Sequence, residues 1–188
     1  MVNLRLAQLS DYSRIAEIHA DSWRQNYRGI LSDAFLDNNL YERRSAIWNN
    51  KLKFPGRDQR VCVAVSNDTI VGFSCLLLND HSVFGSCVDN LHVSANVQKS
   101  GIGKLLMQDC AKHIIHNADN GKMYLWVYAS NLNAIKFYEH LGGINFETVE
   151  KQLEDGTKAL ACRYFWSDVS DLVSLPSFHM DHRRNPRN

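Results

Sequence analysis

The sequence lacks a strong excess of charge of either sign. Its 188 residues include 21 Lys and Arg against 20 Asp and Glu, which gives a formal net charge of +1. A balance this close to zero creates no overall field that would attract nucleic acid or an anionic membrane surface. We therefore expect no nucleic acid and no membrane among the partners, and composition alone names no other.

Long hydrophobic runs are also missing. No segment approaches the roughly 20 apolar residues that a membrane-spanning helix needs. The first five residues alternate polar and apolar side chains. They lack the basic flank and the continuous apolar stretch of a signal peptide. We expect neither a membrane anchor nor a secretion signal in this sequence.

Cysteine is present without any pattern of pairing. Five cysteines occur in apolar segments, are widely spaced and form no CxxC pair: Cys62, Cys75, Cys87, Cys110 and Cys162. This pattern is typical of reduced core thiols in a cytoplasmic protein rather than of a disulfide framework. Asp109, His113 and His116 share one face of an expected helix, but such a trio is typical of a polar surface, and we predict no metal.

Apolar residues are abundant enough for one hydrophobic core. Hydrophobic side chains make up 45% of the sequence, and its length is that of one ordinary domain. We expect a single domain over residues 1–170, followed by a loosely ordered tail over residues 171–188. The part of this tail from Pro176 onward has few apolar residues.

Hydrophobic periodicity predicts strands and helices in a mixed order. Alternating or short apolar segments predict strands at residues 2–6, 61–65, 70–78, 86–93, 123–128, 144–153 and 157–166. Helices are expected to begin near Ser10, Ser32, Leu40, Gly101 and Asn131. The dipeptides Asn67-Asp68 and Asp155-Gly156 indicate turns between paired strands. This order predicts an α/β fold with a mixed sheet flanked by helices.

One polar segment between an expected strand and an expected helix has the composition of a phosphate-binding turn. It consists of Gln98, Lys99, Ser100, Gly101, Ile102, Gly103 and Lys104. Unpaired backbone N–H groups and the helix dipole converge at such a helix start and attract phosphate. Glycines at two positions allow these N–H groups to approach a diphosphate closely. The alternative is an ordinary helix start in which the two glycines are incidental.

Other phosphate-binding motifs do not fit this segment. A Walker loop requires Gly where Gln98 stands and Ser or Thr where Leu105 stands. A dinucleotide fingerprint requires a third Gly where Leu106 stands. The segment is therefore neither of these two motifs.

Two spaced elements resemble one enzyme family. The element Gln98-x-x-Gly101-x-Gly103, which follows Val93, is similar to the Q/R-x-x-G-x-G/A signature of the GNAT N-acetyltransferases. The element Asn131-x-x-Ala134-x-x-Phe137-Tyr138-Glu139-x-x-Gly142 is similar to the family's N-x-x-A-x-x-F-Y-E-x-x-G-F pattern. It departs from that pattern because Gly143-Ile144-Asn145-Phe146 follows instead of an immediate Gly-Phe. The stretch Ser22-Trp23-Arg24-x-x-Tyr27-Arg28-Gly29 also resembles the family's first helix, so the resemblance covers roughly residues 2–166.

This resemblance implies a fold and a function. The implied fold is the GNAT-like acyl-CoA N-acyltransferase fold. The implied reaction moves an acetyl group from acetyl-CoA, as co-substrate, to a primary amine of a small molecule or protein by direct attack in a ternary complex. The rival interpretation is a non-catalytic acyl-CoA sensor or interaction module that keeps the cofactor turn. Family members are often dimers, so a homodimer is also an expectation, although no residue here defines an interface.

The resemblance further assigns cofactor contacts. The implied coenzyme A residues are Leu91, His92, Val93, Gln98, Lys99, Ser100, Gly101, Ile102, Gly103, Lys104, Asn131 and Tyr138. The strand that ends at Val93 is implied to separate from its neighbour and to pair with the pantetheine arm. The N–H of Val93 would then polarise the thioester carbonyl. Asn131 could instead cap the helix that it begins, and both roles stay open.

Catalytic and acceptor-binding residues are predicted with their alternatives. Tyr138 is the candidate donor of a proton to the departing thiolate, since a phenol has a pKa of roughly 10, and a core aromatic is the alternative. Asp89 is the candidate catalytic base, and His92 competes with it. Trp23 and Tyr27 are candidate substrate-binding walls, with core packing as the alternative for Trp23.

Overall fold

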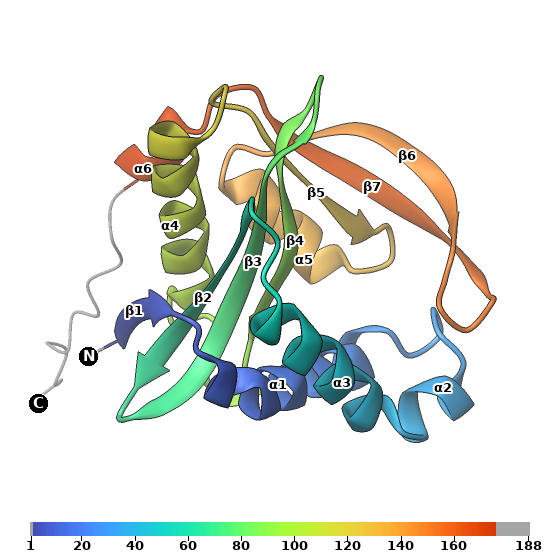
Figure 1. The fold of residues 1–188 in the computed structure, drawn as a ribbon. Helices are drawn as coiled ribbons and strands as arrows, with labels where there is room; N and C mark the ends of the chain where they lie inside the picture. The colour runs from blue at the N-terminus through green and yellow to red at the C-terminus, as the bar shows by residue number, and fades with distance from the viewer. Residues whose placement is uncertain (1, 176–188) are drawn as a thin grey trace, which may run out of the picture.

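A computed structural model describes residues 2–175, and its strands form one mixed sheet in the order β1-β2-β3-β4-β5-β7-β6 (Figure 1). The strands are β1 (Val2–Leu6), β2 (Gln59–Ser66), β3 (Thr69–His81), β4 (Gly85–Val93), β5 (Met123–Tyr128), β6 (Ile144–Gln152) and β7 (Lys158–Trp166). Neighbouring strands are antiparallel except β4 and β5, which are parallel. The predicted α/β fold class with a mixed sheet is confirmed.

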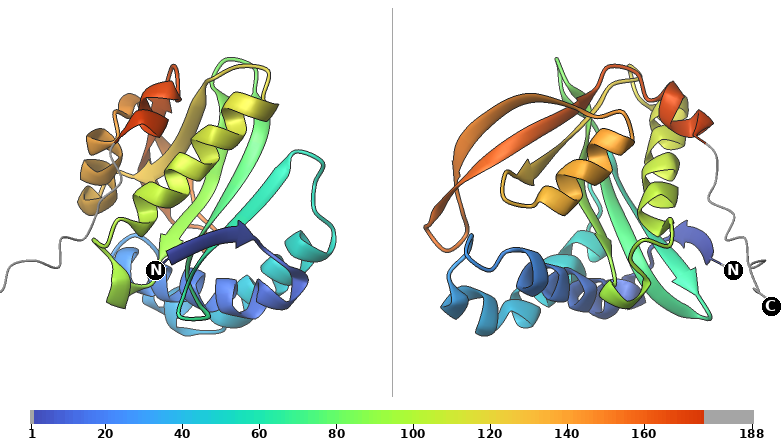
Figure 2. Two further views of the ribbon diagram at one scale, coloured as in Figure 1. Left: turned by 90° about the vertical axis from the view of Figure 1, so that its left-hand side faces the viewer. Right: turned by 180° about the vertical axis from the view of Figure 1, so that it is seen from behind.

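Helices cover both faces of the sheet. They are α1 (Tyr12–Asn26), α2 (Asp33–Asp37), α3 (Leu40–Lys53), α4 (Ile102–Asn117), α5 (Leu132–His140) and α6 (Ser170–Ser174). Two short 3₁₀ turns precede α1 and α4, at Leu9–Asp11 and Ala95–Val97. Helices α1 and α3 lie on one face, and α4 and α5 lie on the other (Figures 1 and 2). Among residues 2–175, no helix has both the length and the apolarity needed to cross a membrane.

Alternation along the strands separates two hydrophobic cores. On the α1 and α3 side, Val63 and Phe73 pack against Trp48. On the α4 and α5 side, Leu125 and Val127 pack with residues of α4, α5 and β7. All five cysteines are buried and free, as predicted, and burial raises the pKa of the Cys62 thiol to about 12. These thiols are therefore core residues and poor nucleophiles.

The first residues of the expected tail are helical. Ser170–Ser174 form α6, and Leu172 is buried in the same core as α4. The side-chain amide of Gln108 on α4 donates hydrogen bonds to the carbonyl oxygens of Leu172 (3.1 Å) and Leu175 (2.9 Å). Residues 171–175 thus pack against α4. The rest of the expected tail, 176–188, lies outside the described residues.

The parallel pairing of β4 and β5 is short. It consists of Ser86 opposite Met123 and Cys87 opposite Tyr124. A bulge in β4 follows, because Asn90 lies opposite Cys75 while Val88 lies opposite Leu76, so Asp89 is the extra residue. Beyond this bulge β4 pairs with β3 alone, and a gap opens between β4 and β5. The strand separation that the family resemblance implied is present.

Candidate active site

A cavity of about 400 Å³ lies where β4 and β5 separate. Its walls come from the end of α1, the second half of β4, β5, the turn before α4, and α5. Of the residues expected to bind the cofactor, those that line it are Leu91, His92, Val93, Gln98, Lys99, Gly101, Ile102, Gly103, Lys104, Asn131 and Tyr138. Ser100 is not in the lining. Its hydroxyl donates a hydrogen bond to the Val97 carbonyl (2.6 Å), which stabilises the turn.

The backbone of β4 presents polar groups to this cavity. The Ser94 N–H donates to the Val71 carbonyl on β3 (2.9 Å). Because successive residues of a strand direct their backbone groups to opposite sides, the N–H and C=O of Val93 point away from β3, toward the gap. The Val93 carbonyl accepts a hydrogen bond from the Gln98 side chain (3.3 Å), as this geometry requires. The Val93 N–H therefore faces the cavity that β5 has left open.

The turn before α4 has a backbone shape that glycine makes possible. Lys99 and Gly101 have left-handed conformations, with φ of 63° and 87°. Helix α4 begins at the next residue, Ile102, so its first N–H groups lie at the cavity wall. A Cβ on Gly103 would lie 3.2 Å from the Phe137 ring, so a side chain there would push α5 away from α4. The two glycines thus form the turn and allow close packing of the two helices.

Tyr138 lies on α5 with its ring in the core below the cavity. The helix starts at Asn131, whose side chain accepts a hydrogen bond from the Ala134 N–H (3.2 Å) and so caps it. Tyr138 is 9% exposed and packs edge-on against Trp166. Burial raises the pKa of Tyr138 above its ordinary value, so the phenol keeps its proton at neutral pH. Tyr138 thus belongs both to the core and to the lining of the cavity.

The two candidate bases have different surroundings. The carboxylate of Asp89 forms an ion pair with Lys51 on α3 (2.7 Å) and accepts a hydrogen bond from the Asn90 side chain (2.7 Å). His92 stacks on His19 with ring centroids 4.6 Å apart, and its Nδ1 is 2.8 Å from the Ser22 hydroxyl. Asp89 is therefore already engaged with a cation, whereas His92 is held between α1 and the cavity.

Burial decides the charge of the two stacked histidines. It lowers the pKa of His92 to about 4, and the nearby charge of Arg44 acts in the same direction. Burial also lowers the pKa of His19, whose Nδ1 accepts a hydrogen bond from the Trp48 indole (2.9 Å). Both rings are therefore neutral at pH 7.

The aromatic wall expected from Trp23 and Tyr27 is only partly at the cavity. Tyr27 is in the lining and meets the Tyr128 ring edge-on at 4.8 Å. Trp23 is not in the lining and packs behind Tyr27, with the Arg44 guanidinium 4.2 Å from its ring centroid. Core packing, the alternative for Trp23, describes its position.

Sequence reasoning missed several lining residues. Ser22, Gln25 and Asn26 all face the cavity from α1. Their spacing of three and four residues marks one polar face of a helix and is a signal that the sequence does contain. Trp126 was missed as well, although alternation with the buried Leu125 and Val127 places its side chain on the other face of β5.

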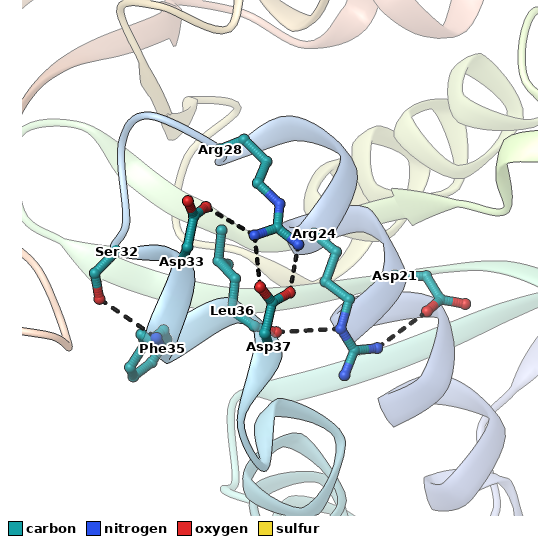
Figure 3. Close-up of polar contacts among 8 residues, drawn as sticks. All are labelled: Asp21, Arg24, Arg28, Ser32, Asp33, Phe35, Leu36 and Asp37. Atoms are coloured by element: carbon teal, nitrogen blue, oxygen red, sulfur yellow. Dashed lines mark hydrogen bonds and ion pairs between the residues drawn. The ribbon is translucent and has the colours of Figure 1, made fainter.

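The α1–α2 connection and the β6–β7 turn meet beside the cavity. Figure 3 shows Arg28 between Asp33 and Asp37, and Arg24 donating to the Leu36 carbonyl (3.2 Å), which together hold α2 against α1. The β6–β7 hairpin curves down to this connection (Figure 1).

Polar contacts join the β6–β7 turn to the α1–α2 connection and to α3. The Ser32 N–H donates to the Asp155 carboxylate (2.7 Å), the Thr157 hydroxyl donates to the Ile30 carbonyl (3.2 Å), and Arg44 pairs with Glu154. We call these three contacts the hairpin clamp.

Metal-ligand groupings are not found in the described part of the chain. No three His, Cys, Asp or Glu side chains within residues 2–175 gather as they would around an ion. Asp109, considered above with two histidines, instead forms an ion pair with Arg60 (3.0 Å).

Comparison with known families identifies the chain. A family model described as the acetyltransferase (GNAT) family matches residues 13–143, more than half of the sequence. The chain belongs to the GNAT acetyltransferase family. The family resemblance predicted from the sequence is confirmed, and with it the assignment as an acyltransferase enzyme.

Two relatives of this GNAT chain are bacterial proteins. An uncharacterized N-acetyltransferase of Bacillus subtilis, YuaI, is 25% identical over 185 residues, which cover 93% of this chain and 98% of the relative. A probable N-acetyltransferase of Mycobacterium tuberculosis is 28% identical over 153 residues, which cover 77% of this chain and 83% of the relative.

Solved structures share the GNAT fold. The PaiA N-acetyltransferase of Thermoplasma acidophilum, solved in complex with coenzyme A, has a TM-score of 0.66 at 18% identity, covering 87% of this chain and 99% of its own. NAA60 of Arabidopsis thaliana, solved with a bisubstrate analogue, has a TM-score of 0.67 at 18% identity, covering 88% and 97%. These similarities bear out the predicted GNAT-like fold.

Proposed function

We propose that this acetyltransferase moves the acetyl group of acetyl-CoA to a primary amine by direct attack within a ternary complex. One observation carries the proposal: a single cavity joins the N-terminus of α4 to the gap between β4 and β5. The N-terminus of α4 can bind an anion, and the gap exposes the backbone of β4. Together they suit a ligand with a diphosphate at one end and an amide-containing arm at the other.

The turn before α4 would hold the diphosphate. The left-handed conformations of Lys99 and Gly101 bring the chain round to the first N–H groups of α4, where the helix dipole favours negative charge. Lys99 and Gln98 also line this end of the cavity. The pantetheine arm would then extend along β4, whose backbone groups at Val93 face the gap.

The chain's own groups suit acyl transfer from a thioester. Acetyl-CoA supplies an activated acyl group, whose C–S bond breaks as the C–N bond forms. The Val93 N–H would stabilise the negative charge that develops on the carbonyl oxygen. Tyr138, which burial keeps protonated, would donate its proton to the leaving sulfur. The proton lost by the amine would pass to Asp89 or His92, both at the cavity.

The compartment, the acceptor class and the oligomeric state complete the proposal. Five free, buried cysteines suit the reducing conditions of the cytoplasm, which we propose as the compartment. The acceptor would be a small-molecule or protein amine. We also propose a homodimer, because family members are often dimers.

A thiol-release assay tests the proposal. The protein is mixed with acetyl-CoA and a panel of primary amines, and free coenzyme A is measured with a thiol reagent. We expect amine-dependent release with at least one acceptor, and no increase when acetyl-CoA is replaced by coenzyme A. Tight coenzyme A binding without release on a broad panel would favour the sensor interpretation and contradict the proposal.

A further inference from the structure

One face of the sheet continues from the cavity across β5, β7 and β6. Trp126 on β5 points to this face, because its neighbours Leu125 and Val127 are buried on the α4 side. Arg163 on β7 lies opposite Trp126 in the register, and Glu147 on β6 lies opposite Arg163. Because Trp126 also lines the cavity, this face forms the approach to the gap from the side opposite α4.

Most cations near this approach are paired with carboxylates. Within residues 2–175, three of its cations pair with carboxylates: Arg44 with Glu154, Lys51 with Asp89 (2.7 Å), and Arg163 with Glu147 (2.8 Å). Lys151 on β6 forms no ion pair among these residues, although the charge of Glu147 acts on it. Its ammonium instead lies 3.3 Å from the centroid of the Trp126 ring.

The Arg163 guanidinium lies against the same indole ring as this ammonium. It lies 4.5 Å from the Trp126 centroid and 3.9 Å from the centroid of Phe84. Its Nη1 is buried and has no hydrogen-bond partner within the described residues. An ammonium without an ion-pair partner and a guanidinium with an unused donor thus lie against the same indole ring.

Desolvation makes this arrangement costly without a ligand. Lys151 is partly buried, and burial, followed by the charge of Arg163, lowers the pKa of its ammonium. The charge of an anion beside Lys151 would offset this lowering of the pKa, and the anion would accept a charge-assisted hydrogen bond. Because Glu147 already neutralises one of the two cations, the pair suits a single carboxylate better than a multiply charged phosphate.

We propose that the acceptor of this enzyme is an amine that carries a carboxylate, and that Lys151 and Arg163 bind this carboxylate beside Trp126. The inference rests on the proposed acetyl transfer, since it assigns the acceptor of that reaction. With its carboxylate at Lys151, an aminocarboxylate directs its amine toward the gap, where the Val93 N–H faces the cavity. Lys151 is thus a specificity-determining residue.

Matched acids and amides test this inference by binding. The probes are glycine, β-alanine, 4-aminobutyrate and 5-aminopentanoate, each compared with its neutral primary amide. Binding to the coenzyme A-saturated protein is measured by titration calorimetry, which needs no turnover. We expect at least one acid to bind about tenfold or more tightly than its amide, because the amide lacks the charge.

Three variants assign the preference to Lys151. Lys151→Met should reduce the acid-to-amide ratio to about one while leaving amide binding unchanged, and Lys151→Arg should retain most of it. The matched control is Lys158→Met, which removes an exposed lysine that is paired with Glu150 on the other face of the hairpin. This control should leave the ratio as in the parent protein.

The outcomes separate this inference from the proposed reaction. No preference for any acid, an equal loss for acid and amide in Lys151→Met, or the same effect in Lys158→Met would each overturn it. A preserved acid preference without thiol release would contradict the acetyl transfer and leave the carboxylate site standing. A thermal melt of Lys151→Met that matches the parent protein shows that the variant is folded.

Discussion

Burial acts on Tyr138 and His92 in the same sense, because it favours the neutral form of each. The phenol keeps its proton, since its pKa is raised, and the imidazole stays unprotonated, since its pKa is lowered to about 4. At pH 7 one cavity therefore contains a group that can donate a proton and another that can accept one. These two residues support predictions on rate and on stability.

Replacing Tyr138 with Phe removes a hydroxyl and retains the ring. The ring packs against Trp166 and Tyr164, so the core is preserved. If the hydroxyl protonates the leaving thiolate, kcat should fall about 100-fold while the Kd for coenzyme A changes less than about threefold. Steady-state kinetics and calorimetry measure the two quantities. An equal loss in both would show that Tyr138 binds the ligand rather than acting in the reaction.

His92 should make stability depend on pH in mild acid. Its pKa is about 4 in the folded protein and about 6.5 in the unfolded chain, so the unfolded chain binds the proton first as the pH falls. The stability is fully present above about pH 6.5 and is lost as the pH falls through 4, by about 2–3 kcal/mol for this group.

Urea denaturation at pH 7.5 and pH 4.5 measures this loss. The variant His92→Gln cannot take up the proton, so the difference between its two unfolding free energies should be about 2 kcal/mol smaller than in the parent protein. A difference unchanged by the substitution would mean that His19 or carboxylates account for the pH dependence.

At the scale of elements, the hairpin clamp joins two segments that are far apart in the sequence. It connects the α1–α2 loop and α3 to the β6–β7 turn through contacts of Ser32, Ile30 and Arg44. Leu153 in that turn also packs with Leu31 and Leu36. Burial alone would raise the pKa of Asp155, but hydrogen bonds from Ser32 and Thr157 outweigh it and lower the pKa. The turn is therefore fixed to the wall beside the cavity.

Removing the carboxylate partner of Arg44 should destabilise the protein. Arg44 is 3% exposed, so Glu154→Ala leaves a buried cation without its partner. We expect a loss of about 1–3 kcal/mol in the free energy of unfolding, below the full cost of a buried pair because the Glu154 side chain is half exposed.

A neighbouring exposed pair provides the control for this substitution. Glu150→Ala breaks the pair with Lys158, in which both side chains are exposed, and should cost less than about 0.5 kcal/mol. Chemical denaturation of both variants makes the comparison. Equal losses would mean that Arg44 is stabilised mainly by stacking on Trp23.

The sequence predicts elements better than the contacts between them. Alternation located the strands, and Asp155-Gly156 located the turn of the last hairpin, because these signals are local. The pair Arg44–Glu154 joins residues 110 positions apart, and no local pattern encodes it. Asp11 shows that contacts between residues close in the sequence are also hard to predict. It directly precedes α1, but its carboxylate accepts hydrogen bonds from Arg5 and the Gln8 N–H and does not cap that helix.

The candidate site was predictable to the extent that its residues lie in motifs. The turn at residues 98–104 and the helix containing Tyr138 each have local patterns, and both line the cavity. Lys151 and Arg163 have no motif. Their relation to Trp126 arises from the register of three strands, which the sequence alone does not specify.

At the scale of the whole molecule, coenzyme A should stabilise the fold. A ligand that binds only the folded state at about 100 times its Kd adds roughly 2.7 kcal/mol, which raises the Tm of a domain of this size by roughly 5–10 °C. Differential scanning fluorimetry measures the shift. Pantetheine, which lacks the diphosphate, should give a clearly smaller shift at the same concentration, and an equal shift would contradict the role of the turn before α4.

Two residue pairs are all that connects β4 to β5, so the sheet consists of a four-stranded block and a three-stranded block with a short seam between them. Along the rest of this boundary, β4 has no strand partner on the β5 side. A bound pantetheine arm would supply the backbone hydrogen bonds that pairing of β4 with β5 would otherwise provide. The ligand would then hold the two blocks of the sheet together as well as react. Its departure would loosen the two blocks first where they are farthest from the seam.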